Sequence, residues 1–263
     1  MITSSTRNRL DQHQISALAL LYRTLPGGFF EVMPHWIRGF SGLQNPFFNI
    51  FLPIDSAGLS DETLADTSAF FSSRNVLYAV ELIHDRLPEG PDYLTDRRYQ
   101  SLPPQPAMLL DGPPNQLSFN SDIVIERVAT VPLLTAFCTL LHRVFDFSLR
   151  DMVKFFPVAY LKEDKIRLYL AFSNEQPVAT GAVICTEGIA TIRDMCTLDE
   201  YRGRGIATTL AHHMINDARG NGCPVAMLYS TAQAYHIFSK LGFEIYTQRQ
   251  WFLPPDIDYE DER

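Results

Sequence analysis

The chain has 263 residues, 46% of them hydrophobic, so it is long enough to bury one large core or two ordinary ones. Its 22 basic and 30 acidic residues give a formal net charge of −8, which argues against a nucleic-acid-binding surface. The N-terminal residues lack the pattern of a signal peptide and no apolar run approaches a membrane span, so we expect a cytoplasmic protein with neither nucleic-acid nor membrane partners.

Four cysteines are spread widely along the chain, as Cys138, Cys185, Cys196 and Cys223. All four fall within apolar segments, and the sequence has neither a CxxC pair nor a His/Cys cluster at zinc spacing. We therefore predict reduced thiols in the core and no metal cofactor.

The first part of the chain combines helices with several short strands. A helix is predicted over residues 10–24, where apolar side chains recur at helical spacing until Pro26-Gly27-Gly28. Ser60 is the expected N-cap of a second helix that ends near Ser73. The other predicted elements are strands at 29–33, 35–40, 47–53, 76–82 and 106–111 and a weaker helix near 93–100. The polar, proline-bearing stretch 111–115 is typical of a linker.

The second part of the chain reads as β-α-α-β-β-β-α-β-α-β. Its predicted elements are strands at 123–128, 165–172, 177–185, 189–197, 223–229 and 243–253, helices at 131–145 and 149–156, one from the glycine turn near 203 to Gly220, and a short one ending at Leu241. The acidic run 256–262 is expected to stay solvated and disordered. The order in the first part, α-β-β-β-α-β-α-β, matches the central portion of this one, which suggests a structural repeat. Two unrelated subdomains remain the alternative.

A glycine-bearing turn joins the strand at 189–197 to the helix that follows. Gly203 and Gly205 lack a Cβ, so a phosphate can approach the backbone closely, and Arg202 and Arg204 add positive charge. The first N–H groups of the helix and the positive end of its dipole also favour an anion. Alone, such a tetrapeptide is more often an ordinary solvated loop, so its position between a strand and a helix is what indicates a phosphate site.

Two motifs in this part resemble those of the GNAT superfamily of N-acetyltransferases. The acyl-CoA signature of that family is Arg or Gln, two free positions, Gly, one free position, then Gly or Ala, and the chain has Arg202-Gly-Arg-Gly205-Ile-Ala207. An Ala-containing helix that ends in Lys-Leu-Gly-Phe follows, here from Ala234 to Phe243. On these motifs, residues 122–263 look like a catalytic GNAT domain.

The whole chain is similar to tandem GNAT proteins, with a degenerate N-terminal half. The resemblance implies an α+β (layered α/β) fold of two GNAT-like halves, each a mixed, mostly antiparallel sheet flanked by helices. We expect residues 1–115 to form the GNAT-like half that has lost the cofactor turn. No Arg-x-x-Gly-x-Gly follows its third strand, and Asp61 and Glu62 in the first turn of the next helix would repel a pyrophosphate.

The resemblance implies an acetyl-CoA-dependent N-acetyltransferase that acts on an amine of a small molecule, protein or peptide. Acetyl-CoA would be the co-substrate, a longer acyl group is an alternative, and a homodimer is left open. The residues implied in cofactor binding are Met195, Cys196 and Thr197 along the pantetheine arm, Arg202, Gly203, Arg204, Gly205, Ile206, Ala207 and Thr208 at the pyrophosphate, and Phe238 near the sulfur.

The catalytic acid and base are less clear from the motifs. The family often has a Tyr four residues before the glycine of Leu-Gly-Phe, and this chain has Phe238, which cannot give a proton. Tyr235 is the first substitute, with protonation of the thiolate by water as the alternative. Asp194 is the candidate base, or else a charge paired with Arg193. A non-catalytic acyl-CoA-binding or interaction protein on the same fold is the competing function.

Overall fold

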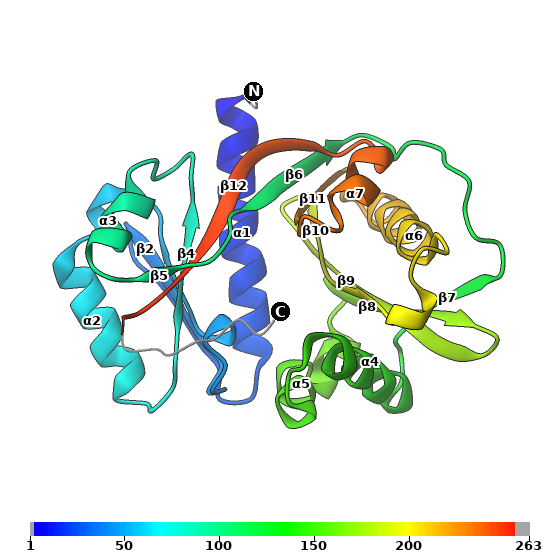
Figure 1. Ribbon diagram of the computed structural model, residues 1–263, viewed down its shortest axis with the longest axis horizontal. Coiled ribbons are helices and arrows are strands. Elements are labelled where there is room, and N and C mark those ends of the chain that lie inside the picture. Colours follow the sequence, from blue (N-terminus) through cyan, green and yellow to red (C-terminus); the bar gives the residue numbers. More distant parts are fainter. Residues whose placement is uncertain (1–2, 256–263) are drawn as a thin grey trace. The chain divides into compact units, whose positions relative to one another are not determined.

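The computed structural model describes residues 3–255 and separates into two compact units (Figure 1). Unit 1 contains the chain up to Ala17 and Ala107–Tyr246, and unit 2 contains Leu18–Pro106 and the chain from Thr247. The chain therefore passes between units within helix α1 (Ser4–Thr24), strand β6 (Gln105–Asp111) and strand β12 (Glu244–Leu253). None of the helices in the described part of the chain is long and apolar enough to span a membrane.

The sheet of unit 1 is mixed and mostly antiparallel. Its strands are β7 (Ile123–Arg127), β8 (Ile166–Ser173), β9 (Gln176–Thr186), β10 (Ile189–Thr197) and β11 (Val225–Tyr229), together with β6. Neighbours pair antiparallel from β7 to β10, β10 pairs parallel with β11, and β11 pairs antiparallel with β6.

Helices cover both faces of this sheet. Along β8 and β9, Tyr169, Ala171 and Val183 face the cluster that contains helix α6 (Ile206–Gly220). Leu168, Leu170 and Ala182 alternate with them and are also buried, so they face the other side, where α4 (Val131–Phe145) packs. Figure 1 shows α6 and α4 as separate helices of this unit. The remaining helices are α5 (Leu149–Phe155) and α7 (Tyr235–Leu241), with the 3₁₀ turns η3 (Val158–Lys162) and η4 (Asp199–Tyr201).

Unit 2 has a smaller sheet with a similar sequence of pairings. Strands β1 (Phe29–Val32), β2 (Trp36–Phe40) and β3 (Ile50–Pro53) are antiparallel neighbours, and β3 pairs parallel with β4 (Ala79–Ile83). The residues Arg249–Phe252 of β12 pair antiparallel with β4, and β5 (Gln100–Ser101) adds to β12. Helices α2 (Asp61–Ser72) and α3 (Gly90–Asp96) and the 3₁₀ turns η1 (Pro46–Phe48) and η2 (Ser56–Gly58) complete the described elements of this unit.

Each unit is completed by a strand from the other part of the sequence. In unit 1, the parallel strand β11 is followed in the sheet by β6, which precedes the 111–115 segment. In unit 2, the parallel strand β4 is followed by the end of β12, the last strand of the chain. The predicted halves 1–115 and 122–263 are continuous stretches of sequence, whereas each compact unit combines two stretches. Whether the two halves are repeats of one domain remains a prediction.

Most predicted elements are present, with differences at their ends. The helix predicted from residue 10 begins at Ser4, and the strand predicted from residue 76 begins at Ala79. The helix predicted near 93–100 is α3, which ends at Asp96 because Arg98 adopts a left-handed backbone with φ of 62°. All four cysteines are buried free thiols, as predicted. The acidic run 256–262 lies outside the described residues.

Candidate active site

Strand β10 is interrupted by a bulge at the residues predicted to meet a pantetheine arm. Its pairing with β9 shifts register between Arg193 and Cys196, and Asp194 takes a left-handed φ of 52°. The Thr180 hydroxyl donates to the Asp194 carbonyl at 2.8 Å and so fixes the bulge. The bulge redirects the backbone of Met195 relative to the regular ladder.

Strands β10 and β11 pair only near their beginnings. Their register joins Ile189–Thr191 to Val225–Met227, after which β10 continues to Thr197 and β11 to Tyr229. Among the described residues, the part of β10 beyond Thr191 therefore does not pair with β11. The pantetheine arm is predicted to lie along this stretch of β10.

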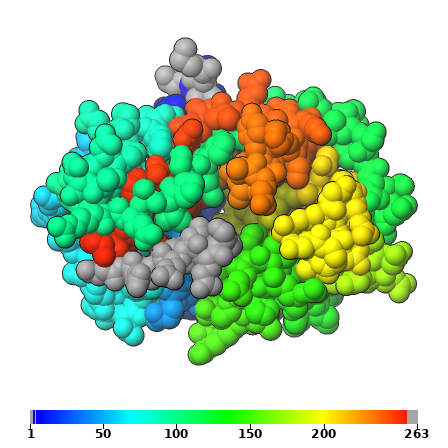
Figure 2. Space-filling view, in the orientation of Figure 1, coloured from blue at the N-terminus to red at the C-terminus, as the bar shows by residue number. Residues whose placement is uncertain are grey.

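The turn after β10 has the backbone that its glycines predict. Gly203 and Gly205 both have φ of 75°, a left-handed conformation that residues with a side chain rarely adopt. A Cβ added at either glycine meets no atom within 4 Å, so open space lies beside both. The four residues from Arg202 to Gly205 are exposed. Figure 2 shows this yellow stretch at the surface, with a hollow between it and the orange atoms of α7.

Helix α6 starts at Ile206 without a side-chain cap. Its N-cap residue is Gly205, and no side-chain cap hydrogen bond is made there within residues 3–255. Uncapped N–H groups and the positive end of the helix dipole together attract an anion. The backbone predicted to hold a pyrophosphate is thus available for one.

Helix α2, which follows strand β3 in unit 2, begins very differently from α6. Ser60 and Thr63 form a capping box, so the Ser60 side chain already accepts from the Thr63 N–H. The first turn also carries Asp61, which bonds Arg97, and Glu62. One N–H group at the start of α2 is therefore already bonded and the first turn carries two acidic residues. The loss of cofactor binding in this part of the chain stays a prediction.

Both arginines of the turn contact η4 in the described structure. Arg202 pairs with Asp199 at 2.7 Å and is half-exposed, and Arg204 donates to the Glu200 carbonyl at 2.8 Å. Arg204 also lies over the Tyr201 ring, 5.0 Å from its centroid. Their positive charge is therefore held beside the glycine turn, and Arg202 would have to exchange Asp199 for a phosphate.

Asp194 is paired with its neighbour along the chain. Arg193 Nε donates to Asp194 Oδ2 at 2.8 Å, and both side chains are partly buried. Buried Tyr160 from η3 lies close enough for both charges to act on it: burial raises the pKa of Tyr160, Arg193 lowers it and Asp194 raises it. Tyr160 is not among the predicted site residues, because it lies far from Arg193 and Asp194 along the chain and belongs to no motif.

The candidate acid and the residue at the usual Tyr position lie on α7 with different surroundings. Tyr235 is the first residue of α7 and is partly buried, with its ring 5.6 Å from that of His236. Phe238 is buried in the core of unit 1 and packs on Phe243 at 5.7 Å. Phe238 therefore serves packing, while the exposed part of Tyr235 leaves it accessible.

The thiol of Cys196 is buried, which disfavours its thiolate form. Burial raises the pKa of its thiol to about 11, although the Thr180 hydroxyl 3.1 Å away lowers it. Only the thiolate attacks carbonyl carbon efficiently, so the protonated side chain is left to packing. The predicted role of Cys196 is a backbone one.

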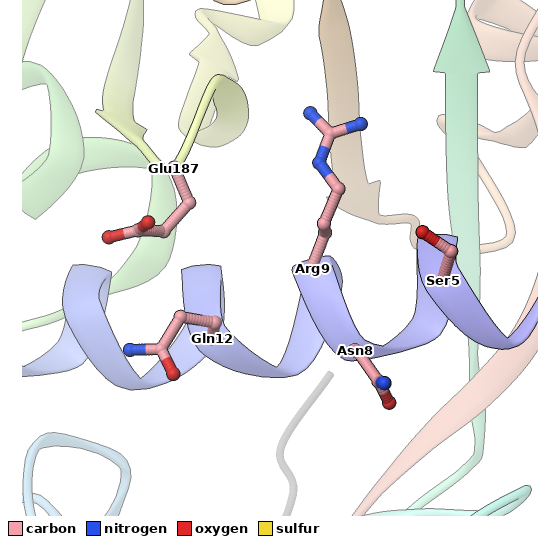
Figure 3. Close-up of a pocket in the computed structure, with 5 residues that line it drawn as sticks. All are labelled: Ser5, Asn8, Arg9, Gln12 and Glu187. Carbon is pink, nitrogen blue, oxygen red and sulfur yellow. The ribbon is translucent and has the colours of Figure 1, made fainter.

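A shallow depression elsewhere on unit 1 does not meet these residues. Ser5, Asn8, Arg9 and Gln12 of α1 line it with Glu187 from the β9–β10 turn. Figure 3 shows these side chains leaving α1 in different directions, without converging on one point with Glu187. We do not assign a function to it.

No three His, Cys, Asp or Glu side chains within residues 3–255 are grouped so as to hold a metal ion.

A family model of known proteins matches the part of the chain that contains these residues. Residues 164–245 match the family model of an acetyltransferase (GNAT) domain, and this range includes the β10 bulge, the glycine turn and α7. No curated protein sequence matches the chain.

Solved structures share the fold across nearly the whole chain. A GCN5-related N-acetyltransferase from Kribbella flavida superposes with a TM-score of 0.75 at 17% identity, covering 95% of both chains. A functionally unknown conserved protein from Staphylococcus epidermidis gives 0.66 at 14% identity over 88% of this chain and 95% of that one. A GCN5-related N-acetyltransferase from Sphaerobacter thermophilus gives 0.61 at 14% identity, covering 87% and 84%. The chain thus carries a segment that matches a GNAT acetyltransferase domain, within a mixed α/β fold that GNAT structures share.

Proposed function

We propose that the chain is an acetyl-CoA-dependent N-acetyltransferase that acts on an amine of a small molecule, a protein or a peptide. The observation that carries this proposal is the junction of β10 and α6. Two glycines with left-handed backbone precede an uncapped helix there, beside two strands whose pairing ends early. The junction lies within the segment that matches the acetyltransferase family model.

The backbone supplies most of the proposed cofactor site. The N–H groups from Gly203 to Thr208 hold the pyrophosphate, with Arg202 and Arg204 as positive charges beside it. The backbone from Met195 to Thr197 pairs with the pantetheine arm and places an N–H near the thioester oxygen. One such donor stabilises the developing oxyanion by roughly 3 kcal/mol. Acetyl-CoA supplies the activated acyl thioester, which is what the acceptor amine attacks.

Two side chains are proposed to move protons in the transfer. The neutral amine forms a C–N bond as the C–S bond breaks, which leaves one proton to remove from nitrogen and one to give to sulfur. Asp194 takes the first, directly or through water, and Tyr235 gives the second. A Tyr235→Phe variant should then turn over more slowly, with a changed pH profile of kcat. An unchanged rate across pH would remove Tyr235 from the mechanism and leave water as the acid.

The phosphate turn is tested by Gly205→Leu. At φ of 75° the leucine side chain is strained and projects into the open space assigned to the pyrophosphate, so acetyl-CoA binding should be lost in calorimetric titration. Gly222→Leu is the matched control. Gly222 follows the other end of α6, has φ of 85° and likewise has no atom within 4 Å of an added Cβ. The Gly222→Leu variant carries a similar backbone strain of about 1–2 kcal/mol and should bind acetyl-CoA with the affinity of the wild type. If Gly205→Leu binds acetyl-CoA as tightly as the wild type, the turn is not the pyrophosphate site.

A non-catalytic acyl-CoA-binding protein is the second candidate. Phe238 is a core residue without a proton to give, and Asp194 is engaged by Arg193. Both observations favour binding without turnover. A broad panel of amines that yields no free CoA, from a protein that binds acetyl-CoA at micromolar concentration, would support this function over the first.

A further inference from the structure

The segment between β6 and β7 lacks helix and strand, yet it is tied to unit 1 at two points. At its beginning, Asn115 donates from its backbone N–H to the Leu241 carbonyl and from Nδ2 to the Lys240 carbonyl, both at 3.0 Å. At its end, Asn120 bonds the start of α6. The stretch that the composition indicates as a linker therefore lies along α7 and α6.

The contacts of Asn120 reach the two residues that precede α6. Asn120 Nδ2 donates to the Arg204 carbonyl at 2.9 Å. The Asn120 backbone N–H donates to the Thr209 hydroxyl at 3.0 Å, and that hydroxyl donates to the Gly205 carbonyl at 3.0 Å. The Thr209 backbone N–H also donates to the Gly205 carbonyl at 3.0 Å, so helix α6 holds that carbonyl as well, whereas the Arg204 carbonyl accepts its bond from Asn120.

The network also defines the orientation of the Asn120 amide. Its Oδ1 accepts from the Asp122 N–H at 3.0 Å, so Nδ2 is the atom that faces Arg204. A packing contact supports the same segment, because the Phe119 ring lies 4.0 Å from the ring of His212 on α6. The Asn120 amide, which donates to the Arg204 carbonyl, is therefore itself held in place by neighbouring residues.

Holding a carbonyl fixes the N–H group on the other end of the same peptide unit. The peptide is planar and trans, so its N–H points opposite to its C=O. Fixing the Arg204 and Gly205 carbonyls orients the N–H groups of Gly205 and Ile206, which are the donors assigned to the pyrophosphate. The Gly205–Ile206 unit is also held by the first backbone bond of α6, so the Arg204–Gly205 unit is the one that would be free to rotate without Asn120.

We propose that Asn120, with Thr209, is a positioning residue that preorganises the pyrophosphate-binding turn. This inference rests on the proposed function for its ligand. Asn120 itself is not a catalytic residue, and its effect on affinity arises because a turn already in the binding conformation does not need to be ordered when the ligand arrives.

Asn120→Ala and Thr209→Val test the network, and Asn115→Ala is the matched control. Asn115 lies on the same segment and makes the same kind of amide-to-carbonyl bond, but to α7. Asn120→Ala should raise the Kd for CoA about fivefold to tenfold, as expected for one hydrogen bond. Thr209→Val should raise it less, because the backbone N–H of residue 209 still holds the Gly205 carbonyl. Their Kd for pantetheine, which lacks the pyrophosphate and is titrated by NMR, should be unchanged, and Asn115→Ala should leave both constants unchanged.

A second measurement reports on the turn without a ligand. In the unliganded protein, Asn120→Ala should speed hydrogen exchange in the peptides that contain residues 203–208, while Asn115→Ala should not. The inference is overturned if Asn120→Ala binds CoA like the wild type, if the Asn115 and Asn120 variants weaken binding equally, or if pantetheine binding falls in proportion. If the wild type binds no CoA, the proposed function fails, and the exchange data still decide whether Asn120 orders the turn.

Discussion

At the scale of single residues, the clearest pH-sensitive group lies away from the candidate active site. His13 of α1 is fully buried, with Nδ1 2.6 Å from the Thr186 hydroxyl and Nε2 2.6 Å from the Thr191 hydroxyl. Burial lowers the pKa of His13 to about 4, despite opposing effects of the Thr186 backbone hydrogen bond and the Glu187 charge. The neutral ring therefore joins α1 to strands β9 and β10 within unit 1.

This lowered pKa predicts a loss of stability on mild acidification. Below pH 6.5 His13 binds a proton in the unfolded chain but stays neutral in the folded protein. The free energy of unfolding therefore falls by up to about 1.4 kcal/mol per pH unit. The loss ends near pH 4, where the folded protein also protonates, and totals roughly 3 kcal/mol. His13→Gln cannot titrate, so its deficit relative to the wild type in urea unfolding should be largest at pH 7 and shrink toward pH 4.

The control is His236→Gln, which makes the same substitution at an exposed histidine. Carboxylates that titrate over the same pH range are present in the wild type and in both variants, so their effect cancels in the comparison. A deficit of His13→Gln that stays constant from pH 7 to pH 4 would mean that His13 is not held neutral.

At the scale of elements, the sequence predicts regular segments well and irregular ones poorly. Helix α4 and strand β10 have the predicted bounds, because an apolar stripe marks the helix and the Glu187-Gly188 turn marks the start of the strand. The two-residue strand β5 has no periodicity to detect and exists only through pairing with β12. Likewise Phe47 and Phe48, predicted as strand, form η1 because Asn45 caps a turn that Pro46 begins.

The candidate site divides in the same way. The turn from Arg202 to Gly205 is local, so its left-handed glycines are predictable from the motif. Tyr160 and Asn120 reach the site only through the tertiary fold, and no spacing along the chain connects them to it. The sequence therefore predicts the glycine turn, but it does not predict residues such as Tyr160 and Asn120 that contact the site from distant parts of the chain.

The contrast between helices α2 and α6 predicts one CoA site per chain. The N-terminus of α2 is closed by the Ser60–Thr63 capping box and carries Asp61 and Glu62, whereas that of α6 is uncapped. Calorimetric titration of the wild type with CoA should give a stoichiometry of one, and Gly205→Leu should reduce it to zero. A second equivalent that persists in Gly205→Leu would show that unit 2 also binds the ligand.

At the scale of the whole molecule, the pairing of strands explains why both parts of the sequence are needed. Five residues of β11, from Val225 to Tyr229, pair with β6, although β6 lies before the 111–115 segment. In unit 2, β4 pairs with Arg249–Phe252 at the end of the chain. Cutting the sequence between the predicted halves would therefore remove one internal strand partner from each unit.

We therefore predict that fragments 1–115 and 116–263 do not fold when expressed separately. Each would expose the edge of a strand that is paired in the intact protein, which favours aggregation over a native core. Expressed together, the fragments can supply each other's missing strand and should give a soluble protein with a cooperative thermal transition. The matched control is the intact chain with a protease site inserted at 116–118 and cleaved after folding, since both strands are then already in place. If fragment 116–263 alone is soluble, melts cooperatively and binds CoA, then β6 is dispensable and the strand pairing of unit 1 does not limit its folding.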